Sequence, residues 1–243
     1  MAKVPENPAE IFSEITNDFK NIFGSELVSI ILYGSGAGIH YIPGKSDLNF
    51  LIILSEEGID NLDNTIITVS RWRKRQVAIP LFMTRAEINS SLDSYPIEFL
   101  TMKKQYVLVY GEDILEGLSF EPSRLRLQCE RELKGKILHL RRGLLKTGGQ
   151  AKYVRELIKA SLTAFISIFK ALLYLKGTDI PQSRRDVIRS VAGVYSIDQD
   201  VFLKCADIKE GIDQIQLSEI QTVFKAYLQE VEKLSRVVDG MSV

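Results

Sequence analysis

The chain has 243 residues, of which 45% are hydrophobic and 26% are charged, proportions that are ordinary for a globular protein. Its charges balance overall, but residues 1–120 hold 10 Lys and Arg against 16 Asp and Glu, whereas residues 121–243 hold 21 against 15. These net charges of −6 and +6 favour two domains over one uniform body. Two histidines exclude a His-rich metal site, and the two cysteines have no metal-ligand spacing.

The first residues, MAKVPENPAEIF, are polar and acidic, and no basic stretch leads into an apolar one. We therefore expect no secretory signal. No apolar run approaches the ~20 residues that span a bilayer, so no membrane partner is expected. The sequence predicts a cytoplasmic protein in which Cys129 and Cys205 are buried thiols.

The first predicted elements are one helix and two strands. Residues 8–23 repeat apolar side chains every four positions, which is typical of an amphipathic helix, and Gly24 ends it. Residues 27–33 and 48–54 are short apolar runs bounded by turn signals, so both are predicted to be buried strands.

A second helix and a third strand are predicted next. Residues 60–74 look helical and end in the basic cluster RWRKR. Residues 76–84 form the third predicted strand, in which Pro80 lacks the N–H that a sheet ladder needs. We therefore expect a sheet edge or a bulge at Pro80.

From residue 121 onward the pattern is almost wholly helical. A capping box from Ser218 to Gln221 is predicted to open the last helix, which runs to about residue 238. The other predicted helices cover 122–146, 151–175, 184–194 and 198–208. We expect an α/β domain at 1–120, with a mixed sheet and flanking helices, and then an all-helical bundle at 121–243.

The glycine-rich stretch YGSGAGIHYIPGKSDLNFLIIL, residues 33–54, carries the strongest functional signal. The dinucleotide fingerprint needs G-x-G-x-x-G at the start of a helix, whereas this loop reads G-x-G-x-G and no helix is predicted after it. A P-loop needs four residues between its glycines and a helix after Lys-Ser, whereas here there are five and a strand follows. An ordinary tight turn between two strands is a further alternative.

The residues Gly34-Ser35, followed after a short gap by Ser46-Asp47-x-Asn49 and an apolar run, resemble the DNA polymerase beta-like nucleotidyltransferase superfamily. In that family, Gly-Ser ends one strand and Asp-x-Asp opens the next. The chain is also similar to small bacterial members such as aminoglycoside nucleotidyltransferases, which pair a catalytic domain with a helical bundle. A segment like LVYGEDIL at 108–115 is common between those two halves.

The resemblance implies transfer of NMP from an NTP to a hydroxyl of a small molecule or a protein. It implies that Gly34, Ser35, Gly36 and Ser46 hold the nucleotide phosphates and that Asp47 and Asn49 serve catalysis as Mg²⁺ ligands. The residue types suit these roles, because glycine lets the backbone approach a phosphate and a Ser hydroxyl can donate to it. Alternate strand residues point to one face, so Asp47 and Asn49 could meet one ion.

The sequence departs from the family pattern at two acids. Asn49 stands where a second Asp is expected, and an amide contributes no charge to balance a second metal ion. The third carboxylate is expected within residues 76–84, which contain no Asp or Glu. Glu87 or Glu98 could replace it, whereas Glu56 and Glu57 are expected past the strand end. The alternative function is therefore a catalytically degenerate protein, a pseudoenzyme that acts as a nucleotide-binding, regulatory or interaction module.

Other features have competing interpretations. The cluster RWRKR at 71–75 could bind nucleic acid, but the solvated end of a helix is favoured, so nucleic acid is not an expected partner. Helix 122–146 holds eight Lys and Arg against two Glu and is interpreted as an exposed face, with attraction of a polyanion as the alternative. His40 could contact a phosphate, although a bystander role is favoured. The C-terminal helices could also form a homodimer.

Overall fold

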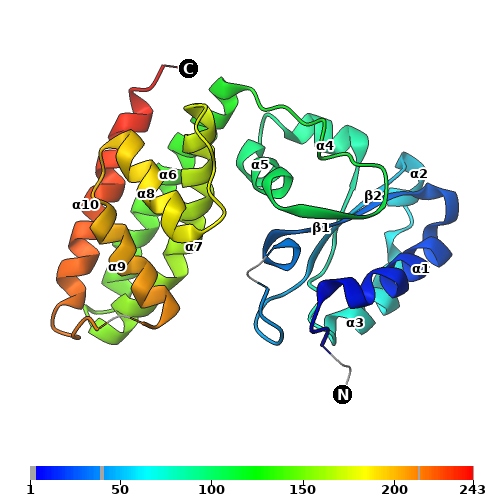
Figure 1. Cartoon of the computed structure of the whole chain (residues 1–243), viewed down its shortest axis with the longest axis horizontal. Helices are drawn as coiled ribbons and strands as arrows, with labels where there is room; N and C mark the ends of the chain where they lie inside the picture. Colours follow the sequence, from blue (N-terminus) through cyan, green and yellow to red (C-terminus); the bar gives the residue numbers. More distant parts are fainter. Residues whose placement is uncertain (1–3, 39–40, 213, 243) are drawn as a thin grey trace. The chain divides into compact units, whose positions relative to one another are not determined.

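The computed structural model describes residues 4–38, 41–212 and 214–242 (Figure 1). Contacts within the chain divide it into two compact units, one up to Ser119 and one from Phe120 onward. The first unit contains all four strands and the second is built from helices. The structure therefore has the predicted class, a mixed sheet with flanking helices followed by a helical bundle.

The N-terminal helix forms as predicted, in two parts. A single 3-10 turn, η1 (Pro8–Ile11), is capped by Asn7 and runs into α1 (Phe12–Phe23). The apolar stripe of this helix is buried against the sheet: Ile11, Ile15, Phe19 and Phe23. After a further 3-10 turn, η2 (Gly24–Glu26), the chain enters the sheet.

The sheet has the strand order β3-β2-β1-β4. β1 (Leu27–Tyr33) is antiparallel to both β2 (Asn49–Leu54) and β4 (Tyr106–Gly111), and β2 is parallel to β3 (Leu81–Thr84). The two strands predicted around the loop are confirmed. The edge strand β4 lies where the sequence suggested only a linking segment.

The third predicted strand is wrong at its start. Only Leu81–Thr84 forms β3, and the preceding chain touches the sheet through a single bridge between Val77 and Leu48. Pro80 explains the interruption, because it has no N–H for the ladder. The expectation of a sheet edge at this position is confirmed, since β3 is the outer strand next to β2.

Helices cover both faces of this sheet (Figure 1). On one face lie α1 and α3 (Ile66–Arg73), whose Trp72 belongs to the same buried cluster as Phe50 and Ile52 of β2. On the other face lie α4 (Arg85–Ser91) and α5 (Pro96–Lys104). Two short helices, α2 (Glu56–Ile59) and η4 (Leu62–Thr65), connect β2 to α3. The helix predicted over 60–74 is thus shorter, since only its second half is α-helical.

The second unit is a bundle of long helices whose positions match the prediction. They are α6 (Pro122–Lys146), α7 (Ala151–Leu175), α8 (Arg184–Tyr195), α9 (Gln199–Glu210) and α10 (Ile220–Asp239). Aromatic rings from three of these helices pack together. The ring centroids of Phe169 of α7 and Phe202 of α9 are 5.1 Å apart, and those of Phe165 of α7 and Tyr227 of α10 are 5.5 Å apart. Both cysteines are buried in this unit, and burial raises the pKa of Cys205.

Contrary to the expectation that no apolar segment is long enough, α7 could cross a membrane by length and composition alone. Nine of its residues are nevertheless buried within the unit. This burial is typical of the central helix of a bundle, whose polar positions fall on the exposed side.

The capping box predicted at the start of α10 is wrong. The residue before the helix is Glu219, and no side chain caps the first turn. The Gln221 amide instead donates to the carbonyl oxygen of Gly149 at 2.6 Å. Gln221, which the local pattern predicted to cap the helix, thus makes a long-range hydrogen bond instead.

Candidate nucleotide site

The glycine-rich loop leaves the sheet at the end of β1. Gly34 adopts φ = +73°, a left-handed conformation that favours glycine, and its N–H donates to the carbonyl oxygen of Gln105 at 3.1 Å. The chain then forms a single 3-10 turn, η3 (Gly34–Ala37). One of the predicted phosphate donors, the Gly34 N–H, is therefore already bonded, while Ser35 is exposed on the turn.

Gly36 is buried where the loop packs on the sheet. A side-chain carbon at this position would lie 2.7 Å from Cδ2 of Leu48, which is closer than packing allows. A larger residue would therefore force the Leu48 or Leu32 side chain, or the loop itself, to shift. This close packing accounts for one glycine of the turn without a ligand.

Asp47 and Asn49 lie at the entrance of β2, beside this loop. Asn49 is paired with Tyr33 across the β1–β2 ladder, and a side-chain carbon at Gly34 would lie 3.8 Å from the Asn49 Nδ2. Asp47 is exposed, and its carbonyl oxygen accepts a long hydrogen bond of 3.4 Å from the same Nδ2. The structure thus brings Gly34, Ser35, Asp47 and Asn49 to one end of the sheet.

Ser46 has a structural part in the turn before β2. Its Oγ accepts a hydrogen bond from the Ile42 N–H at 3.1 Å, and its own N–H donates to the Ile42 carbonyl oxygen at 2.9 Å. The Ser46 side chain therefore stabilises the turn that precedes Asp47 and β2. His40, the other candidate in this loop, lies outside the described residues.

The carboxylates considered as replacements for the third acid lie elsewhere. Glu87 is the third residue of α4 and accepts the N–H of Thr84 at 2.7 Å, a capping box at the far end of β3. Thr84 pairs with Leu54, five residues along β2 from Asn49, or roughly 16 Å at about 3.3 Å per residue. Glu87 therefore does not replace the third acid at this site.

Glu98 and the two glutamates after β2 are also placed away from the loop. Glu98 is exposed in the first turn of α5. The opposite end of this helix contacts the loop through Gln105, which lies roughly 10 Å from Glu98 along the helix axis at about 1.5 Å per residue. Glu56 and Glu57 lie in α2, past the end of β2, as expected. Within the described ranges, no three His, Cys, Asp or Glu side chains form a metal-binding group.

The donor set at the β2 entrance fits one Mg²⁺ that is shared with a bound triphosphate. Mg²⁺ in phosphate sites is commonly held by one or two carboxylates, with the remaining positions filled by substrate phosphates and water. Asp47 offers one carboxylate and Asn49 one neutral amide oxygen. A pair of ions would need more negative charge than these two side chains supply.

Sequence reasoning missed a row of side chains that crosses three strands at this end. Tyr106 of β4 pairs with Tyr33 of β1, which in turn pairs with Asn49, so all three share one face of the sheet. The Tyr106 hydroxyl donates to Asp113 at 2.8 Å. Burial is the larger cause and this hydrogen bond the next, and together they raise the pKa of Tyr106 to about 12. The run YVLVY, rich in strand-forming residues, was the signal that could have predicted the row.

Only the tryptophan of the basic cluster RWRKR, at the end of α3, belongs to the buried core; Arg71, Arg73 and Lys74 are exposed. Trp72 is only 1% exposed, and its indole N–H donates to Asp18 of α1 at 2.8 Å. Arg71 pairs with Asp18, and Arg75 pairs with Glu14 at 2.5 Å. The tryptophan is therefore not available to stack on a base, and the helix-end interpretation is the one that these contacts favour.

The cations of α6 are largely matched by acids within the second unit. Lys134 contacts Glu130 at 2.6 Å and Asp239 at 2.8 Å, and Arg141 contacts Glu232 of α10 at 2.8 Å. These ion pairs favour the interpretation of α6 as an exposed face of the bundle. His139 of the same helix is also exposed.

Comparison with known proteins supports the fold. No family model matches the sequence, and no curated protein matches it. Among solved structures, the chain is similar to the spectinomycin adenyltransferase AAD(9) from Enterococcus faecialis, solved with ATP and spectinomycin. The two share 14% sequence identity over 93% of this chain and 100% of that one, with a TM-score of 0.57.

This likeness covers both units, and at 14% identity it is a likeness of fold. The predicted resemblance to nucleotidyltransferases similar to the aminoglycoside enzymes is therefore confirmed for the fold. The roles of Gly34, Ser35, Gly36, Ser46, Asp47 and Asn49 stay predictions.

Proposed function

We propose that this protein is a nucleotidyltransferase that transfers NMP from an NTP to a hydroxyl of a small molecule or a protein. The observation that carries the proposal is the position of Asp47 and Asn49 beside the Gly34–Ser35 turn, in a chain with the fold of an adenyltransferase. The adenyltransferase was solved with ATP and a small molecule, which supports a nucleotide and a small-molecule acceptor as partners.

In the proposed reaction, the acceptor hydroxyl oxygen forms a bond to the α-phosphorus of the NTP. The bond from that phosphorus to the bridging oxygen of the β-phosphate breaks, pyrophosphate leaves, and the hydroxyl proton passes to solvent. The exposed Ser35 hydroxyl would donate to a phosphate oxygen, and the Asp47 carboxylate and the Asn49 amide oxygen would hold the Mg²⁺. When bound, this ion neutralises phosphate charge and orients the triphosphate.

A second candidate function is nucleotide binding without transfer, as in a regulatory or interaction module. Asn49 favours it, because its amide can ligate an ion but adds no charge to balance one. The bonded N–H of Gly34 bears on both functions alike, because it leaves the loop one backbone donor fewer for a phosphate. Both functions share the nucleotide site and differ in the chemical step.

Transfer of label from α-³²P NTPs, with Mg²⁺ and with the protein itself or a panel of hydroxyl compounds as acceptors, separates the two functions. The proposal expects label on one acceptor class, and it expects Asp47→Ala to abolish that label. Asp60→Ala is the matched control, because Asp60 is an exposed acid beyond the other end of β2 and should keep full transfer. Equal transfer by the two variants would refute the assignment of Asp47, and binding without any transfer would favour the second function.

A further inference from the structure

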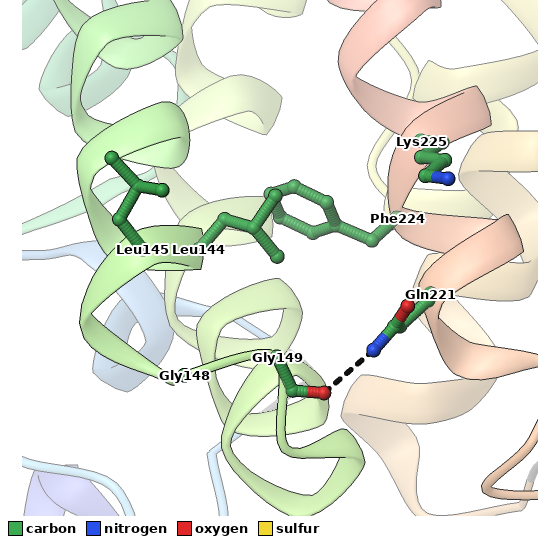
Figure 2. Close-up of a pocket in the computed structure, with 7 residues that line it drawn as sticks. All are labelled: Leu144, Leu145, Gly148, Gly149, Gln221, Phe224 and Lys225. Carbon is green, nitrogen blue, oxygen red and sulfur yellow. Dashed lines mark hydrogen bonds between the residues drawn. The ribbon is translucent and has the colours of Figure 1, made fainter.

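A cavity of about 290 Å³ opens at one end of the helical bundle, within the second unit (Figure 2). It is formed by the last turn of α6, the turn that follows it, and the first turns of α10. The residues that line it are Leu144, Leu145, Gly148, Gly149, Gln221, Phe224 and Lys225. This volume is at the lower end of the range for small-molecule sites, about 300–1,000 Å³.

The walls of this cavity are apolar. Figure 2 shows the Leu144 side chain of α6 facing the Phe224 ring of α10 across the cavity. Phe224 is fully buried and forms the floor, whereas Leu145 is 80% exposed at the entrance. Consecutive glycines at 148 and 149, both with positive φ, keep the connecting turn free of side chains beside this floor.

The backbone groups around the cavity are already hydrogen-bonded. The carbonyl oxygen of Leu144 accepts from the Thr147 N–H, and that of Leu145 accepts from the Gly148 N–H, each at 3.1 Å. The carbonyl oxygen of Gly149 accepts from Gln221, and the Gly149 N–H donates to the Thr147 Oγ1 at 3.2 Å. A ligand would therefore find its polar partners among side chains at the rim.

Two side chains of α10 supply those partners. Gln221 and Lys225 are four residues apart, so they lie on the same side of the helix, next to Phe224. The bond to Gly149 fixes the Gln221 amide, as Figure 2 shows, and the exposed Lys225 brings a positive charge to the same edge. An apolar cavity with a few converging polar groups is the usual form of a small-molecule site.

We propose that this cavity binds a small amphipathic anion, a carboxylic acid with an apolar body. The apolar part lies against Leu144 and Phe224, which face each other in Figure 2, with the exposed Leu145 at the rim, and the carboxylate meets the Lys225 ammonium. A charge-assisted hydrogen bond of this kind is stronger than one between neutral groups, so the charge of the ligand should matter. The site lies in the second unit, whereas the proposed nucleotide site lies in the first.

Isothermal titration of the full chain with octanoate tests the proposal, with octan-1-ol as the uncharged probe of the same length. Octanoate should bind at one site per chain, and octan-1-ol should bind roughly tenfold more weakly. Lys225→Met should weaken octanoate roughly tenfold and leave octan-1-ol unchanged. Lys152→Met, which removes an exposed charge of α7 outside the cavity, should change neither.

A second pair of variants tests the position of the site on α6. Leu145→Glu places a negative charge at the entrance and should abolish octanoate binding. Leu138→Glu is its matched control, because Leu138 is 59% exposed two turns earlier and does not line this cavity. Neither change touches a buried residue, so both proteins should fold. No saturable octanoate binding, equal binding of octan-1-ol, or equal loss in the two Leu variants would overturn the proposal.

Discussion

Asn49 is the residue whose chemistry decides how the candidate site handles charge. Its side chain lies close to Gly34 and is paired with Tyr33, at the start of β2 and two residues after Asp47. The side-chain amide of Asn and the carboxylate of Asp have similar size and shape, but only the carboxylate offsets the charge of a divalent cation. The geometry at this position is therefore compatible with a metal ligand of either kind.

Asn49→Asp should strengthen Mg²⁺ binding in the presence of ATP, because it adds a carboxylate without changing the size of the side chain. We expect a gain of roughly tenfold in apparent Mg²⁺ affinity, about the effect of one charged ligand. Titration of the protein with Mg²⁺ at fixed ATP measures it. Asn64→Asp, an exposed change in η4, serves as the control, and an equal gain in both variants would show a general charge effect.

Tyr106 provides a pH-dependent test of the row next to this site. Its pKa is raised from 10.0 to about 12 by burial and by its hydrogen bond to Asp113. Because the folded state favours the protonated phenol, this stabilisation is complete below pH 10 and is lost as the pH rises through about 12. Asp113→Asn should lower the Tyr106 pKa toward 10.0, as followed by NMR of its ring carbons.

The same substitution should change the pH dependence of stability. Between pH 10 and 12 the wild type should lose more stability than Asp113→Asn, while the other tyrosines titrate alike in both proteins. Asp93→Asn, at an exposed acid elsewhere in the first unit, should behave as the wild type. An unchanged Tyr106 pKa in Asp113→Asn would contradict the role given to this contact.

The sequence predicts the local part of the site better than its long-range part. Gly34, Ser35, Asp47 and Asn49 are close in sequence, and two strands that flank one loop must bring them near each other. Tyr106 of β4 and Gln105, the residue after α5, lie more than fifty residues later, and no local pattern links them to the loop. Gln105 in particular removes a backbone donor that the loop alone would be expected to offer.

At the scale of elements, helices with a clear apolar stripe are predicted almost to their ends. α6 and α7 have the boundaries expected from the sequence, because Pro122 and the glycines after Lys146 mark them. The predicted starts of β3 and α10 are wrong for different reasons. Pro80 interrupts the ladder before β3, whereas at α10 the Gln221 side chain bonds to Gly149, a partner far along the chain.

Two serines near helix starts in the bundle should differ in their effect on stability. Ser183 caps α8, since its Oγ accepts the Asp186 N–H at 3.1 Å, whereas no side chain caps α10 after Ser218. Ser183→Ala should lower the free energy of unfolding by about 1 kcal/mol, and Ser218→Ala should leave it nearly unchanged. Urea unfolding of the two variants measures both, and a comparable loss in Ser218→Ala would restore the predicted capping box.

At the scale of the whole molecule, the charge difference between the halves of the sequence parallels a division in structure. The acidic half corresponds to the unit with the sheet and the basic half to the bundle, whose helix α6 carries the excess of cations. The bundle pairs many of these cations internally. A homodimer through the C-terminal helices stays a prediction, for which the exposed leucines of α6, Leu127, Leu138 and Leu145, are the natural positions to test.

The end of the sheet at Asp47 and Ser35 is the proposed nucleotide site. Isothermal titration with ATP, CTP, GTP and UTP in the presence of Mg²⁺ tests it most directly. We expect saturable binding of at least one nucleotide, weakened roughly tenfold or more by Asp47→Ala and unchanged by Asp60→Ala. Absence of binding by all four nucleotides, or equal binding by the two variants, would contradict the account.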